Sequence, residues 1–120
     1  MTLVSLVFGG NQAARERAIA AAIASDISSA AIIEGMPSGE SALDDKTQES
    51  DLELFRVAAG CPCCSGNLTI RVTLNRALKR RPARLYLSLS NAAHKSQVLD
   101  FLQEPQYLAL LKIGPEIDCS

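Results

Sequence analysis

Short apolar runs, separated by glycine and polar stretches, recur along this chain. Leu3 to Phe8 is almost continuously apolar and ends at Gly9-Gly10, which is typical of a buried parallel strand that enters a tight turn. Three later runs have a similar character and predict further strands: residues 30–34, 52–57 and 84–90.

Apolar residues at helical spacing lie between these runs. Ile19, Ile23 and Ile27 recur every four residues, and Asn11 can cap the helix that they predict. Residues 68–74 alternate as a strand would, but the basic turn at residues 79–81, followed by proline, favours a helix. Two more segments follow the strand at 84–90: a helix that ends at residue 102, and a last helix or edge strand over residues 106–112.

Strands that alternate with helices predict an α/β fold. We expect one three-layer domain over residues 1–120, with a mainly parallel sheet of about four or five strands flanked by helices. Hydrophobic residues make up 48% and charged residues 21%, and the net charge is −1, so the composition does not indicate a nucleic-acid partner. No apolar run approaches the roughly 18 residues of a membrane span, and the first residues lack a basic leader, so we expect a cytoplasmic protein without a membrane partner.

Three of the four cysteines, Cys61, Cys63 and Cys64, fall within four residues. Their thiolates would anchor zinc or another soft or borderline divalent ion, with a fourth ligand from water, His94, Cys119 or a partner molecule. We rank Cys119 below water because we expect the chain near it to be mobile. Two other interpretations remain open: Cys61 and Cys64 as a thiol–disulfide couple, or cysteines that simply pack in the core.

The stretch Gly60-Cys61-Pro62-Cys63-Cys64 resembles the G-C-x-C-C motif of the CobW-like metal-insertion GTPases, a branch of the P-loop class. From Leu3 to about Leu110 the chain follows the order of the front part of that family's domain. The resemblance implies a reduced, degenerate P-loop NTPase-like fold and a role in zinc binding or regulation. The partners that it implies are a metalloprotein client or a full-length CobW-like relative.

The phosphate-loop pattern G-x-x-x-x-G-K-[ST] is incomplete in this chain. With Gly9 at the first glycine, Ala14 stands at the second glycine, Arg15 at the lysine and Glu16 at the Ser/Thr that would ligate magnesium. We therefore expect no GTP hydrolysis and no enzyme. At most, phosphate would bind weakly at these residues: Gly9, Gly10, Asn11 and Arg15. A weak nucleotide hydrolase and a purely structural turn are the alternatives.

Three further predictions concern the end of the strand at residues 84–90, the cations near it and the last apolar segment. Ser88 takes the place of an acidic residue of the resembled family, and His94 follows the same strand at the rim expected to carry the cysteines. The cations around residues 71–84 lack interleaved aromatic residues, which favours a solvated helix end over RNA binding. The apolar segment Leu108 to Ile113 can lie at a sheet edge and close a homodimer.

Overall fold

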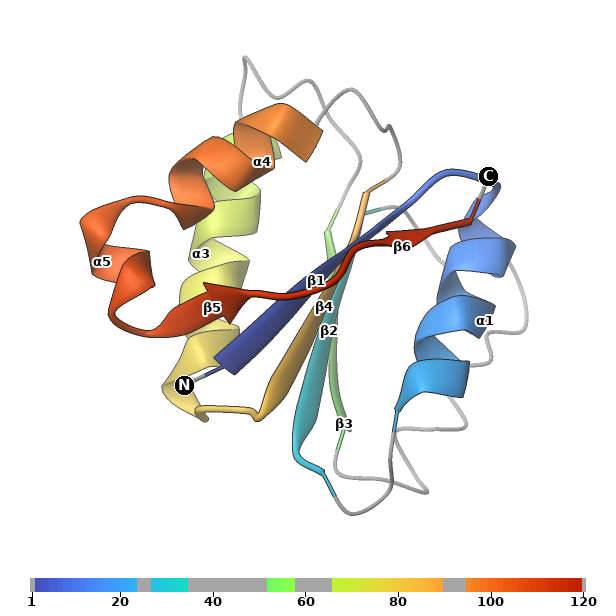
Figure 1. The fold of residues 1–120 in the computed structure, drawn as a ribbon, viewed down its shortest axis with the longest axis horizontal. Helices are drawn as coiled ribbons and strands as arrows, with labels where there is room; N and C mark the ends of the chain where they lie inside the picture. Colours follow the sequence, from blue (N-terminus) through green and yellow to red (C-terminus); the bar gives the residue numbers. More distant parts are fainter. Residues whose placement is uncertain (1, 24–26, 35–51, 58–65, 90–94, 120) are drawn as a thin grey trace.

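The computed structural model describes residues 2–23, 27–34, 52–57, 66–89 and 95–119. Its elements follow one another along the chain as labelled in Figure 1: β1 (Thr2–Phe8), α1 (Gln12–Ala22), β2 (Ser29–Glu34), β3 (Leu52–Val57), α3 (Gly66–Lys79), β4 (Arg84–Ser88), α4 (Lys95–Leu102), α5 (Pro105–Leu108), β5 (Leu111–Ile113) and β6 (Ile117–Asp118).

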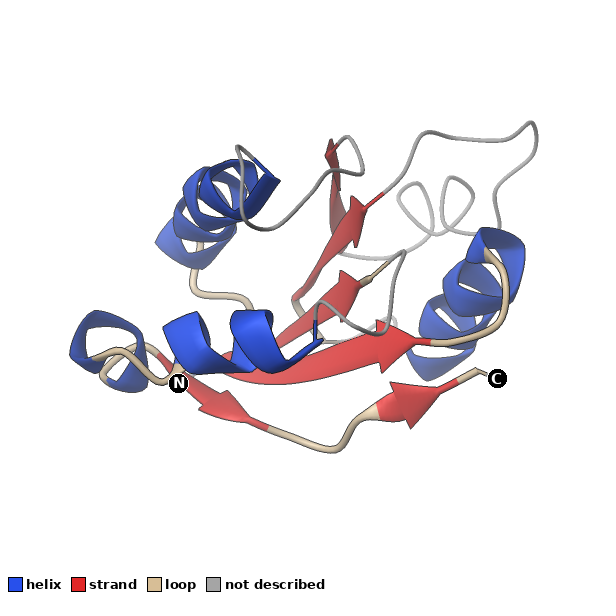
Figure 2. Cartoon of the chain, turned by 90° about the horizontal axis from the view of Figure 1, so that it is seen from above, coloured by secondary structure: helices blue, strands red, loops and turns tan. Residues whose placement is uncertain are grey.

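The strands form one parallel sheet in the order β3-β2-β4-β1-β5, and β6 pairs with β1 beyond β5. Helix α1 covers one face, whereas α3, α4 and α5 lie on the other side (Figures 1 and 2). The predicted three-layer α/β architecture is confirmed. Within the described residues the sheet has six strands rather than four or five, because the C-terminal segment contributes two short ones.

Strand residues alternate between two hydrophobic clusters, one on each face of the sheet. In β4, Leu85 and Leu87 point into the cluster beneath α3 and α4, whereas Tyr86 joins the cluster beneath α1. The apolar stripe predicted for α1 is shorter than expected. The helix ends at Ala22, and Ile23 already has an extended backbone, so Ile27 lies outside the helix.

The ambiguous segment after the cysteines is a helix, as the basic turn and the proline predicted. Leu74, Ala77 and Leu78 of α3 are buried against the sheet, and Val72 is exposed. Beyond the last helical residue, Arg81 adopts a left-handed backbone with φ 49°, and its N–H donates to the carbonyl of Leu78 at 3.0 Å. This bond closes the end of the helix.

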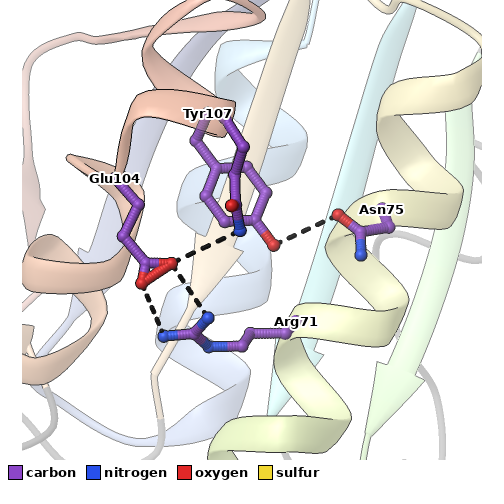
Figure 3. Close-up of polar contacts among 5 residues, drawn as sticks. Arg71, Asn75, Glu104 and Tyr107 are labelled. Carbon is purple, nitrogen blue, oxygen red and sulfur yellow. Dashed lines mark hydrogen bonds and ion pairs between the residues drawn. The ribbon is translucent and has the colours of Figure 1, made fainter.

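Polar contacts attach the end of α4 and the short helix α5 to α3 (Figure 3). Arg71 makes a two-point contact with Glu104, with N–O distances of 2.9 and 3.0 Å. The hydroxyl of buried Tyr107 donates to Oδ1 of Asn75 at 3.1 Å. Arg71, which the sequence placed among a run of cations, is therefore paired with a carboxylate.

The segment predicted to be a helix or an edge strand contains both. Helix α5 gives way to β5, and after a break at Gly114-Pro115 the chain rejoins β1 as β6. The sequence analysis missed β6, because Ile117 stands alone between charged residues and forms no pattern. No helix in the described ranges is long and apolar enough to cross a membrane.

Candidate functional site

The carboxyl edge of the sheet between β1 and β4 is the candidate site. β1 leads into α1 on one face, whereas the chain after β4 continues into α4 on the opposite face. A crevice forms where neighbouring strands lead to opposite faces, and open α/β sheets bind their ligands there. The described residues at this edge are the turn after β1, the first turns of α1 and the end of β4.

The turn that follows β1 is short and left-handed. Gly9 and Gly10 have φ values of 80° and 59°, a backbone conformation that favours glycine. The side chain of Asn11 accepts the N–H of Ala14 at 2.8 Å, and α1 begins at Gln12. The connection between β1 and α1 therefore consists of three residues, Gly9, Gly10 and Asn11. Gln12 and Ala13, which would lie in the loop of a phosphate-binding motif, are already helical here.

Arg15 extends from α1 toward the end of β4 at this edge and is 4% exposed. Its Nε donates to the hydroxyl of Ser88 at 3.2 Å, and its Nη1 donates to the carbonyl oxygens of Gly9 and Gly10, each at 3.1 Å. The structure therefore brings three of the four predicted phosphate-site residues into contact. The guanidinium binds the carbonyl side of the turn and joins α1 to β4.

Glu16, at the position of the magnesium ligand, is also 4% exposed and faces β3. One carboxylate oxygen lies 2.9 Å from Nη2 of Arg56, and the other accepts the side-chain amide of Gln12 at 3.1 Å. Arg56 was not predicted as a site residue, although a cation within a largely apolar strand was a signal. This ion pair links the first helix to the far edge strand of the sheet.

The C-terminal segment covers one side of the turn. The N–H of Cys119 donates to the carbonyl of Phe8 at 2.8 Å, and a Cβ on Gly10 would lie 2.7 Å from the carbonyl oxygen of Cys119. Lys95 holds the same segment through Glu116 at 2.6 Å, and its ammonium lies 4.7 Å from the ring centre of Phe8. Cys119, for which the sequence suggested a mobile stretch of chain, thus pairs with the end of β1 through its backbone N–H.

The predicted metal ligands Cys61, Cys63, Cys64 and His94 lie outside the described residues. The described residues on either side of the three cysteines are Val57, at the end of β3, and Gly66, at the start of α3. Within the described ranges, no group of three His, Cys, Asp or Glu residues is placed to hold a metal ion. Cys119 lies beside β1, which is three strands from β3, or roughly 14 Å at the usual strand spacing.

The donor chemistry of the cysteine stretch suits zinc and cobalt, which accept thiolates in tetrahedral sites. No family model and no solved structure matches the chain. The chain is 35% identical over 60 residues to the zinc chaperone YeiR of Escherichia coli K12, and the match covers 49% of this chain but 18% of that relative's length. This partial similarity to a zinc chaperone agrees with the resemblance of the G-C-x-C-C stretch to CobW-like proteins.

Proposed function

We propose that this chain binds zinc, or a similar soft divalent ion, through Cys61, Cys63 and Cys64, and takes part in metal delivery in the cytoplasm without hydrolysing GTP. The observation that carries the proposal is the 35% identity to a zinc chaperone over about half of the chain. The thiol cluster supplies the chemistry. A metalloprotein client or a full-length CobW-like relative is the proposed partner.

Three thiolates with an exchangeable fourth position suit transfer of a metal better than storage. Thiolates this close repel one another when ionised, and a dication relieves that repulsion. Metal binding displaces protons from the thiols, so affinity should rise with pH. Water, His94 or a donor from the client would fill the fourth position. Cys119 ranks last, since its backbone pairs with β1, across the sheet from β3.

The described part of the phosphate-loop region supports the absence of GTP hydrolysis. Arg15 is directed at carbonyl oxygens of the turn, and the carboxylate of Glu16 is paired with Arg56. A phosphate loop needs backbone N–H groups and a free cation around the anion, and a hydroxyl for magnesium. The residues at these positions instead fasten α1 to the sheet.

Metal stoichiometry of the reduced protein tests the proposal. We expect about one zinc or cobalt ion per chain in the wild type and in Cys119→Ser, and a large loss in Cys63→Ser. Cobalt loading adds a spectroscopic readout, because thiolate ligation gives a charge-transfer band that the Cys63 variant should lack. Equally negligible metal in all three proteins would refute the proposal.

A further variant, Cys61→Ser, separates metal binding from thiol redox chemistry. Cys63 competes with Cys64 as a partner for Cys61, so we expect slow disulfide reduction by the metal-free protein. Rapid reduction of a test disulfide, abolished by Cys61→Ser, would favour the redox alternative instead.

A further inference from the structure

We propose that the amino edge of the sheet, opposite the carboxyl edge that carries the turn after β1, is a docking site for an acidic peptide segment of a partner protein. A cavity of about 340 Å³ opens there between the end of α3 and the turn before β5. It is lined by five apolar residues, Leu78, Pro82, Ala83, Ala109 and Leu110, by Thr2, and by Arg81, which contributes a cation. Binding cavities combine apolar side chains with a few polar and charged groups in this way.

Arg81 has an unusual backbone for its residue type. Its φ of 49° places it at the helix end where glycine is the common choice, and an arginine there is strained. Strained residues concentrate at functional sites, and they persist where the surrounding structure holds them in place. Arg81 lines the cavity, and no carboxylate in the described ranges forms an ion pair with it.

The surroundings of the cavity are strongly basic. Exposed cations occupy the last turn of α3, the residues just after it and the start of β4: Arg76, Lys79, Arg80, Arg81 and Arg84. Within the described residues, one carboxylate is paired with this group, that of Glu53 with Arg80 at 3.3 Å. The whole chain has a net charge of −1, so this edge is far more positive than the molecule. Its field favours an acidic partner.

Exposed aliphatic side chains indicate how such a partner is anchored. Leu108 and Leu110 are 53% and 49% exposed, and Leu110 forms part of the cavity wall. None of the described residues that line the cavity is aromatic, so those residues offer nucleic-acid bases no stacking surface. A second copy docked by two-fold symmetry would place two basic edges against each other. An acidic peptide with an aliphatic anchor fits both the charge and the walls.

A short fluorescent peptide of alternating glutamate and leucine is the probe, and the matching lysine–leucine peptide is its control. We expect the acidic peptide to bind with a micromolar dissociation constant that rises when salt is added. The basic peptide should not bind. Arg81→Gly should weaken binding about tenfold. Its thermal midpoint should remain at or above that of the wild type, because glycine suits this backbone. Arg81→Lys should retain part of the affinity, and Leu110→Ser should lose most of it.

Arg17→Ala is the matched control, because Arg17 is an exposed cation of α1 on the opposite face of the sheet, and binding should not change. Lack of binding by the acidic peptide, or equal loss in the Arg17 variant, would overturn the proposal. So would tighter binding of single-stranded RNA, or a wild-type dimer that Leu110→Ser dissociates. Zinc stoichiometry should be the same in all these variants, so failure here is distinguishable from failure of the proposed metal function.

Discussion

Arg15 and Glu16 occupy positions that the phosphate-loop pattern reserves for lysine and Ser/Thr, yet both side chains are buried in intramolecular contacts. The sequence indicated that the substitutions weaken phosphate binding, but it gave no sign that these residues are fixed by the protein itself. The contacts of these two side chains depend on where α1 begins. Because Asn11 caps a helix that starts at Gln12, the side chains of Arg15 and Glu16 reach β4 and β3.

Gly10→Ala should destabilise the protein by roughly 2–3 kcal/mol, since alanine disfavours a positive φ and its Cβ would meet the carbonyl oxygen of Cys119 at 2.7 Å. Urea denaturation measures the change. In a chain shortened to end at Ile113 the collision is absent, and only about 1 kcal/mol from the backbone should remain. An equal effect in both backgrounds would contradict this interpretation of the contact.

Arg81→Gly should stabilise the protein by about 0.5–1 kcal/mol, because glycine adopts the left-handed conformation without strain. Thermal and urea unfolding check the result. Arg80→Gly is the matched control: Arg80 has no positive φ, so glycine there should not stabilise. A lower midpoint for Arg81→Gly would mean that the side chain contributes more to folding than its backbone strain removes.

At the scale of elements, the apolar runs predicted β1 to β4 well, because buried parallel strands are continuous in hydrophobicity. The helix after the cysteines was predicted from its basic end and Pro82. Strand β6 and the Arg56–Glu16 pair were missed, because each depends on contacts between residues far apart in the chain. The cysteine stretch was recognisable from its spacing alone, whereas the cavity beside Arg81 requires the packing of α3 against the turn before β5.

The pair that joins α1 to β3 is suited to a double-mutant cycle. Glu16 and Arg56 side chains are 5% and 17% exposed, so removing one partner leaves a largely buried charge. Glu16→Leu or Arg56→Leu alone should cost about 3 kcal/mol, and the double variant should lose less than the sum of the two. Additive losses would show that the two charges do not stabilise each other.

At the scale of the molecule, every strand pairing among the described residues is parallel, and the two ends of the sheet carry different chemistry. The carboxyl edge carries the turn after β1 and receives the chain that leads to the cysteines, while the amino edge carries the exposed cations. We expect nucleotide binding to be absent because of the short turn after β1 as well as the buried contacts of Arg15 and Glu16.

Restoring the pattern tests that expectation. Isothermal calorimetry should detect no micromolar binding of magnesium GTP by the wild type. It should also detect none by the triple variant Ala14→Gly, Arg15→Lys and Glu16→Ser, because α1 still begins at Gln12. Micromolar binding by the triple variant would show that the two buried side chains, and not the short turn, prevent nucleotide binding.

The central strand β1 finds its hydrogen-bonding neighbours late in the chain. Its first partner in sequence is β4, where Leu3 pairs with Arg84, 81 positions further on, and β5 and β6 follow later. At about 5–20 residues per second, a ribosome needs roughly 4–16 s to make that stretch. During this time a strongly apolar strand emerges without its partner, so we expect holdase chaperones to bind nascent β1. The yield of the folded protein in cells should therefore depend on them.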